Sequence, residues 1–372
     1  MQYRQAGKTG ISLSILGFGG NNLAMLPDGS IDEKKAIQAF QYGIQKGINY
    51  ADTGSHYMNS KNEEVLGKAL RDFDRDKFYI TAKVFTPMVK SADEFEKYLN
   101  TSLERLATDY VDFYMFHALN KEFWENVVLK FNFLDKMREA KATGKARHLG
   151  FSFHDDLATF QRICESFEDW EMCLVLLNYT DGQNQAGFKG IKYAHDRGMG
   201  VAIMEPLKGG RLANPPGELA DFFPKIKTNA EWCFDYLWHN PHITTVVSGM
   251  KNKEMVAENI MYADRSYPGM LSAREEAMYV EAGKLFASIS KIDCGGCKYC
   301  QPCPNKVNVP EIIKLYNESG RGGIDETLVK YRALDVKADD CVECGFCKSQ
   351  CPRNLDIPEL LKLIARYFER EI

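Results

Sequence analysis

Residues 30–52 read SIDEKKAIQAFQYGIQKGINYAD, a stretch that contains the repeating unit of the fold. It begins with Ser30-x-x-Glu33, a capping box in which a hydroxyl and a carboxylate bond the free backbone N–H groups at the start of a helix. Gly47 follows the helix and supplies the left-handed residue at which helices commonly end. The short apolar run after Gly47 ends in Asp52. The stretch therefore predicts a helix and then a buried strand whose last side chain is ionisable.

The same order of helix, glycine and short apolar strand recurs through the first 265 residues. Several of the predicted strands are almost continuously apolar, as expected for parallel strands that helices cover on one side. Eight such strands predict an α/β fold of the (β/α)8 TIM barrel type, about 250 residues long. A doubly wound open sheet is the alternative, but no Gly-x-Gly-x-x-Gly turn follows the first strand. The predicted strands are Ile15–Gly19, Ile48–Asp52, Phe78–Val84, Val111–His117, His148–Ser152, Cys173–Asn178, Gly200–Glu205 and Thr244–Ser248.

The pattern changes after the eighth strand. We expect the barrel over residues 1–270, a linker helix over 271–290 and a small, mostly helical domain over 291–372. Within that domain, Pro310–Asn317 and Pro358–Phe368 have helical spacing with a proline in the first turn.

Composition excludes several classes of protein. The 372 residues are 45% hydrophobic and carry a formal net charge of −4. Acidic and basic residues are interspersed, so no basic face for nucleic acid or anionic lipid is indicated. No stretch approaches the roughly 18 apolar residues of a membrane span, and the N-terminus has no apolar signal region. We therefore expect a soluble, cytoplasmic protein that binds neither nucleic acid nor membrane.

Eight of the eleven cysteines lie in the C-terminal region. In a small secreted protein this density would indicate disulfides, but after nearly 300 residues of intracellular-looking chain it favours metal binding. The second run has the C-x2-C-x2-C-x3-C-P spacing of bacterial ferredoxins, and the first run is one residue shorter at its last interval. Structural zinc is the alternative, although zinc does not require the triple spacing. The predicted ligands are Cys294, Cys297, Cys300, Cys303, Cys341, Cys344, Cys347 and Cys351.

Ionisable side chains end several of the predicted strands, where barrel enzymes carry their catalytic groups. Asp52, Lys83 and His117 close or nearly close the second, third and fourth strands, and Tyr57 follows in a loop. Tyrosine can protonate a developing alkoxide, and the Lys83 ammonium would lower its pKa of about 10 by favouring the phenolate. Asp52 would keep Lys83 charged, and neutral His117 would orient a carbonyl oxygen. Singly, each residue fits a cap or a solvated strand end, but four suitable types at one barrel end favour catalysis.

These residues, with the surrounding Asn49–Thr53, Thr81–Lys83 and Phe116–His117, resemble the catalytic tetrad of the aldo-keto reductase superfamily. The resemblance implies an oxidoreductase that transfers hydride between NADP or NAD and a small carbonyl or alcohol substrate. Segments after the later strands are similar to the family's contacts with nicotinamide, pyrophosphate and adenosine. The implied cofactor-binding residues are Ser152, Asn178, Glu205, Leu207, Gly209, Gly210, Ser248, Gly249, Met250, Glu258 and Asn259.

The sequence departs from the family pattern in two places. Leu174 and Leu176 occupy the region where the family usually has a glutamine on the nicotinamide carboxamide, so Asn178 is the substitute that the sequence offers. Met255 stands where members that prefer NADP commonly have an arginine. Only two lysines, at 251 and 253, are close to it in sequence, and the choice between NADP and NAD stays open.

The C-terminal runs resemble a subset of aldo-keto reductases that carries a ferredoxin-like domain, through Cys297–Cys300 and Cys344–Cys347. Two [4Fe-4S] clusters are implied, with the fourth ligands Cys303 and Cys351 exchanged between the runs as in two-cluster ferredoxins. The leading hypothesis is a carbonyl reductase whose clusters are structural, redox-sensing or in exchange with a redox partner protein. The competing hypothesis is an iron–sulfur electron carrier or redox-assembly subunit with a non-catalytic barrel as scaffold.

Overall fold

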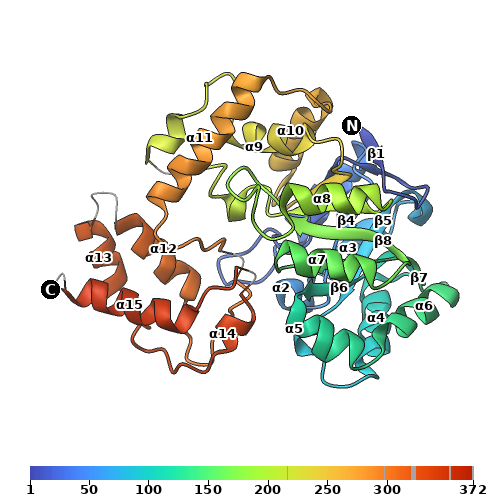
Figure 1. Ribbon diagram of the computed structural model, residues 1–372, viewed down its shortest axis with the longest axis horizontal. Coiled ribbons are helices and arrows are strands. Elements are labelled where there is room, and N and C mark those ends of the chain that lie inside the picture. Colours follow the sequence, from blue (N-terminus) through green and yellow to red (C-terminus); the bar gives the residue numbers. More distant parts are fainter. Residues whose placement is uncertain (216, 297, 320–323, 352, 371–372) are drawn as a thin grey trace. The chain divides into compact units, whose positions relative to one another are not determined.

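The computed structural model describes residues 1–215, 217–296, 298–319, 324–351 and 353–370. The chain forms two compact units (Figure 1). The first contains Met1–Pro206 and Glu231–Ala273, and the second contains Leu207–Ala230 and Arg274–Ile372. The segment that follows the seventh barrel strand therefore groups with the C-terminal part of the chain, although the boundaries expected from the sequence include it in the barrel.

Eight parallel strands of the first unit form a closed barrel in the order β10-β3-β4-β5-β6-β7-β8-β9. All eight strands predicted from the sequence are present, with ends that differ by up to three residues. The prediction of a (β/α)8 barrel is confirmed, and the closed sheet excludes the doubly wound alternative. The strands are β3 (Leu16–Gly19), β4 (Tyr50–Asp52), β5 (Tyr79–Val84), β6 (Val111–Leu119), β7 (Ala146–Phe153), β8 (Trp170–Leu176), β9 (Gly200–Met204) and β10 (Thr245–Ser248).

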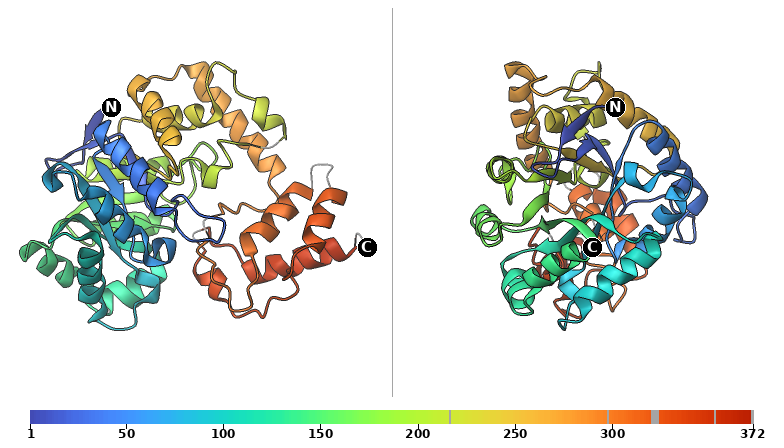
Figure 2. Two further views of the ribbon diagram at one scale, coloured as in Figure 1. Left: turned by 180° about the vertical axis from the view of Figure 1, so that it is seen from behind. Right: turned by 90° about the vertical axis from the view of Figure 1, so that its right-hand side faces the viewer.

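Helices cover the outside of the barrel, and α1, α3 and α4 run side by side there, coloured blue to cyan in Figure 2. Helix α1 is capped by Asp32, whose carboxylate accepts the Lys35 N–H at 3.1 Å. The predicted cap Ser30 is wrong, because its hydroxyl bonds Asp28 instead at 2.6 Å. The helices of this unit are α1 (Glu33–Gln45), α2 (Tyr57–Ser60), α3 (Asn62–Leu70), α4 (Glu94–Leu106), α5 (Lys121–Phe123), α6 (Phe133–Ala142), α7 (Leu157–Glu165), α8 (Gly187–Asp196), α9 (Asn229–Trp238) and α10 (Lys253–Arg265), with the short 3-10 helices η1 (Arg75–Lys77) and η2 (Thr86–Met88) and the π-helix η3 (Trp124–Leu129).

An antiparallel hairpin that the sequence did not predict precedes the barrel. Its strands, β1 (Tyr3–Gln5) and β2 (Ser12–Ser14), have three residues each. Ala6 and Leu13 from this hairpin are fully buried in one apolar cluster with Tyr50 and Phe113 of the barrel interior. The hairpin therefore covers the amino-terminal side of the barrel core.

The barrel interior changes from apolar to polar along the strands. On β6, Phe113 and Met115 belong to the apolar interior cluster, and His117 is the next residue with the same orientation. On β4, Tyr50 lies in that cluster and Asp52 comes two residues later. Polar side chains thus gather at the carboxyl ends of the strands, above a dry core.

Helices also dominate the second unit, where those expected near Pro310 and Pro358 are present. Val309, Ile313 and Leu361 are among the residues of its apolar core. The bounds are α11 (Ala273–Ile289), α12 (Val309–Ser319), α13 (Ile324–Arg332), α14 (Phe346–Ser349) and α15 (Ile357–Arg370), with turns η4 (Lys208–Gly210) and η5 (Gly217–Asp221). Across the described residues, no helix combines the length and the hydropathy needed to cross a membrane.

Candidate active site

The four residues predicted to be catalytic meet at the carboxyl ends of β4, β5 and β6. The Lys83 ammonium lies 2.6 Å from Oδ1 of Asp52 and 3.4 Å from the phenol oxygen of Tyr57. The same phenol oxygen lies 3.4 Å from Nε2 of His117. All four side chains are at most 5% exposed. The Tyr57 oxygen is therefore in reach of both a cation and an imidazole.

Lys83 is fully buried, and its hydrogen-bond partners fit an ammonium group. Its nitrogen donates to Asp52, to the Thr53 carbonyl at 2.6 Å and to Tyr57, which uses three donors. Burial lowers the pKa of Lys83, and the adjacent Asp52 carboxylate opposes that shift. Burial likewise raises the pKa of Asp52 against the effect of the Lys83 charge. Each group thus depends on the other to stay charged away from water.

A sharp turn presents Tyr57 to the barrel mouth. Residues 58–60, within the short α2, all have positive φ, between 52° and 65°, so the chain turns in the left-handed sense just before α3. The Asn62 amide donates to the carbonyls of Gly54 at 2.8 Å and Tyr57 at 3.2 Å. These bonds offset part of the strain of three left-handed residues, and Asn62 therefore positions the Tyr57 loop.

A second support for this loop comes from α4. Arg105 donates to the Ser55 carbonyl at 3.0 Å and lies 3.4 Å from Oε2 of Glu63, a fully buried carboxylate. Glu63 and Arg105 were not predicted from the sequence, because nothing in their local pattern distinguishes them from ordinary helix-surface residues.

His117 is neutral at physiological pH. Burial lowers its pKa well below the usual value, and the nearby His56 and Lys83 lower it further. A neutral imidazole can donate one hydrogen bond from one ring nitrogen, which is the role expected for a group that orients a carbonyl oxygen.

A second histidine, which the sequence analysis missed, adjoins the site. The His56 ring stacks on Phe85 with centroids 3.7 Å apart and lies 4.5 Å from the His117 ring. Burial lowers the pKa of His56 to about 3, so this ring is neutral as well. Its position directly before Tyr57 was the available signal.

Two of the predicted nicotinamide contacts lie at the same end of the barrel, Ser152 near the end of β7 and Asn178 just after β8. The Ser152 hydroxyl, on β7, accepts the Ala118 N–H at 2.8 Å and can still donate its own hydrogen. The Asn178 amide donates to Asp181 at 2.8 Å and to the Glu205 carbonyl at 3.2 Å. Its oxygen accepts from the N–H and hydroxyl of Thr180. Asn178 would have to exchange one of these bonds to hold a carboxamide, so its cofactor role stays a prediction.

The predicted adenosine-side residues lie on β10, in the turn after it and on α10. The Asn259 amide donates to the Ser248 hydroxyl at 3.2 Å, and both side chains are buried, as is Met250. Glu258 is exposed on α10. A side chain on Gly249 would lie 2.6 Å from Cβ of Asn22, so only glycine fits there.

Three further predicted contacts, Leu207, Gly209 and Gly210, belong to the second unit. Both glycines have positive φ, 67° and 92°. A Cβ atom on Gly209 would lie 2.3 Å from the Gly295 carbonyl oxygen. Because glycine has no side chain, the Gly209 backbone lies closer to Gly295 of the first cysteine run than any other residue at this position would allow.

The predicted metal ligands are only partly described. Cys297 lies outside the described residues. Among the other residues of the described ranges, no group of three or more His, Cys, Asp or Glu side chains is arranged to hold a metal ion. Cys294, Cys300 and Cys351 nevertheless line one cavity. Burial raises the pKa of Cys300 to about 12, so without a cation the thiol keeps its proton.

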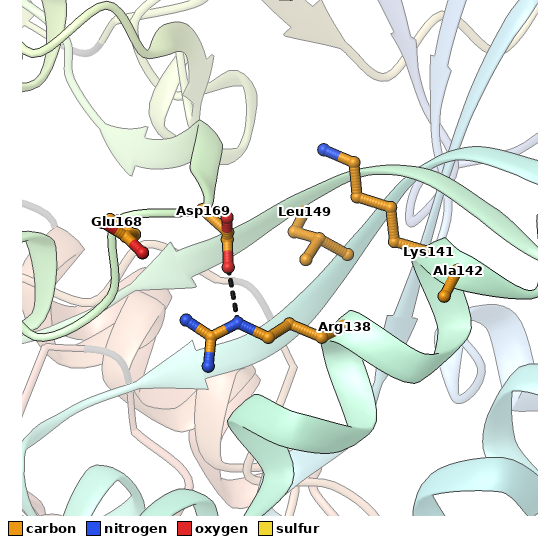
Figure 3. Close-up of a pocket in the computed structure, with 6 residues that line it drawn as sticks. All are labelled: Arg138, Lys141, Ala142, Leu149, Glu168 and Asp169. Carbon is orange, nitrogen blue, oxygen red and sulfur yellow. Dashed lines mark hydrogen bonds and ion pairs between the residues drawn. The ribbon is translucent and has the colours of Figure 1, made fainter.

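A separate hollow of about 450 Å³ lies away from this chemistry (Figure 3). Arg138 of α6 pairs across it with Asp169 at 2.6 Å. Asp169 comes directly before β8, at the amino end of that strand. The hollow therefore opens on the other side of the barrel from the tetrad, and its opposite charges neutralise one another.

The fold and the tetrad geometry agree with what comparisons with known proteins find. The family model "Aldo/keto reductase family" matches residues 15–270. L-Galactose dehydrogenase of Arabidopsis thaliana is 26% identical over 286 residues, 70% of this chain and 87% of that protein. The aldo-keto reductase AMT2 of Alternaria alternata is 27% identical over 276 residues, 64% of this chain and 72% of that protein.

Solved structures show the same barrel. The holo form of aldo-keto reductase AKR11C1 from Bacillus halodurans aligns with a TM-score of 0.64 and 23% identity over 76% of this chain and 96% of that one. An aldo/keto reductase from Klebsiella pneumoniae, solved with NADP and acetate, aligns with a TM-score of 0.61 and 21% identity over 75% of this chain and 94% of that one.

The chain belongs to the aldo/keto reductase family. It is therefore an oxidoreductase. The family match ends at residue 270, before the cysteine runs, and gives no evidence for a ferredoxin-like domain.

The two neutral histidines predict an acid-sensitive barrel. The pKa of His56 is about 3 in the folded protein, whereas an unfolded histidine titrates near 6.5. The unfolded state therefore binds more protons below about pH 6.5, and the free energy of unfolding falls as the pH falls from there toward 3. We expect His56→Phe, which keeps a ring on Phe85, to reduce this slope by up to about 1.4 kcal/mol per pH unit.

Urea unfolding followed by tryptophan fluorescence measures this slope in the first unit, which holds all four tryptophans of the chain. Replacement of the exposed His195 by glutamine is the control. Equal slopes for His56→Phe and the unmodified protein would contradict the prediction.

Proposed function

We propose that the protein interconverts a small carbonyl compound and the corresponding alcohol with a nicotinamide cofactor. The observation that carries the proposal is the Tyr57 oxygen, held within 3.4 Å of both the Lys83 ammonium and Nε2 of His117. When bound, the reduced cofactor supplies the hydride to the carbonyl carbon, and a proton must then reach the carbonyl oxygen.

Tyr57 is the proposed proton donor. As its proton leaves, negative charge develops on the phenol oxygen, and the Lys83 ammonium stabilises that charge in a site closed to water. Asp52 and the Thr53 carbonyl keep Lys83 in place. Neutral His117 holds the carbonyl oxygen next to Tyr57. In the oxidising direction Tyr57 takes the proton back, as microscopic reversibility requires.

The residues predicted to hold the cofactor fit it in part. Ser152 has a hydroxyl that can donate to the carboxamide. Asn178 would have to give up a bond. Two Klebsiella pneumoniae structures that share the fold contain NADP and NADPH, which supports NADP(H) over NAD(H). The exposed Lys251 and Lys253 could meet a 2′-phosphate in place of an arginine at Met255.

Replacement of Tyr57 by phenylalanine should lower kcat for carbonyl reduction about a hundredfold to ten-thousandfold, the usual contribution of general acid catalysis. The binding of NADPH should not change. A panel of aldehydes and ketones with NADPH fluorescence measures both. Tyr98→Phe, on α4 outside the barrel, is the matched control. Full activity in Tyr57→Phe would favour the competing hypothesis of an electron carrier with a non-catalytic barrel.

We further propose that the C-terminal unit binds two [4Fe-4S] clusters. The spacing of the two runs supports this, as does the cavity lined by Cys294, Cys300 and Cys351, because it joins the first run to the last cysteine of the second. In a cubane each thiolate binds a different iron, so its ligands lie farther apart than those of a single ion. Hydride transfer moves two electrons and a cluster accepts one, so a redox partner or a structural role is needed for the clusters.

Anaerobically isolated protein should contain about eight iron atoms per chain, four for each cluster. Zinc in their place would amount to about two ions, since each structural zinc takes four thiolates. Metal and sulfide analysis distinguishes these cases. Cys300→Ser should lose iron, whereas Cys233→Ser, on α9 of the barrel, should not. Zinc without sulfide would contradict the cluster proposal.

A further inference from the structure

The loop after β9 is fastened inside the second unit by its two charged side chains. The Lys208 side chain, 1% exposed, pairs with Asp293 at 2.8 Å. Arg211 donates to the Cys294 carbonyl at 2.8 Å and to the Ser290 hydroxyl at 2.9 Å. Both cations also lie over the buried Phe286 ring of α11, at about 5 Å from its centroid. The loop therefore has little freedom to move independently of the first cysteine run.

The residues that fasten the loop are direct neighbours of candidate cluster ligands. Asp293 precedes Cys294, and the Arg353 that also pairs with Asp293, at 2.6 Å, comes two residues after Cys351. Close packing adds to these bonds, because the Gly209 backbone meets the Gly295 carbonyl. One carboxylate thus joins the loop to both cysteine runs.

The base of this arrangement is rigid. The Asn317 amide on α12 accepts the Ile292 N–H and donates to the Ile292 carbonyl, both at 2.8 Å. Ile292 and Asn317 are buried. The backbone just before Asp293 is therefore held in place by α12. The fixed position of Asp293 in turn fixes the position of the Lys208 ammonium.

We propose that Asp293 and Arg211 are positioning residues for nucleotide binding, which hold Leu207–Gly210 in the conformation that receives the cofactor's phosphates. The proposal rests on the proposed function, which gives that loop its role. Its consequence is that the first cysteine run, and any cluster it carries, sets the affinity of the oxidoreductase for its nucleotide. Asp293 acts on the loop through its ion pair with Lys208, so we expect its effect in the affinity for the nucleotide.

The test compares full-length Asp293→Asn with the unmodified protein. Asparagine has nearly the same shape but lacks the charge that holds Lys208 and Arg353. We expect the Kd for NADPH, from tryptophan quenching, to rise about tenfold, which is about 1.4 kcal/mol. Hydrogen exchange should become faster in residues 207–212. Iron content and kcat at saturating NADPH should not change.

Glu326→Gln is the matched control, because it breaks an exposed ion pair with Lys330 in the same unit. Arg211→Lys, which keeps the charge but loses the bonds to Cys294 and Ser290, replaces Asp293→Asn if that variant loses iron. An unchanged Kd with unchanged exchange overturns the inference alone. Failure of the unmodified chain to bind NADPH or NADH overturns the proposed function and this inference with it.

Removal of iron with a chelator provides a second arm. If Asp293 transmits the state of the first run, stripping should weaken NADPH binding in the unmodified protein and have a smaller effect in Asp293→Asn. Equal weakening in both would show that the coupling does not pass through Asp293.

Discussion

The buried charge of Lys83 is the constraint on which the site depends. An ammonium without access to water costs several kcal/mol unless acceptors replace its hydration. Here Asp52, the Thr53 carbonyl and Tyr57 supply three acceptors from one short stretch of chain. Barrel closure brings that stretch beside β5, where Asp52 is in register with Thr81, two residues before Lys83. The pairing of β4 with β5 that forms the barrel therefore also supplies the acceptors that keep Lys83 charged beside Tyr57.

The sequence predicted the barrel well because parallel strands covered by helices are nearly continuous apolar runs. The polar residues at or near the ends of these strands are the ones that the structure brings together in the candidate site. The N-terminal hairpin was missed because strands of three residues have no measurable alternation. His56 was missed because it stacks on Phe85, a residue that directly follows β5 and is distant in the sequence. Ser30 and Asp32 are both good caps, and only the start of α1 decides between them.

The second unit was harder to predict. Cysteine spacing is a local property and identified the two runs, whereas the grouping of Cys351 with the first run was implied only by the resemblance to two-cluster ferredoxins. Cys351 does line a cavity with Cys294. Residues 207–230 follow a barrel strand and so look like a barrel loop. Leu219 and Phe223 of this segment are buried, and the Phe223 ring lies 5.3 Å from Tyr279 on α11. Contacts distant in sequence therefore determine where this segment belongs.

The most direct test of the account is the pH dependence of kcat in Asp52→Asn. Without the carboxylate, burial lowers the pKa of Lys83 further, with the Glu63 charge still opposing the shift, so the amine should lose its proton at a lower pH than in the unmodified protein. The account predicts that kcat falls with rising pH in Asp52→Asn, and that this fall begins at a lower pH than in the unmodified protein. A pH profile of Asp52→Asn that superimposes on that of the unmodified protein would contradict the claim that the Asp52 and Lys83 pair supports proton transfer by Tyr57.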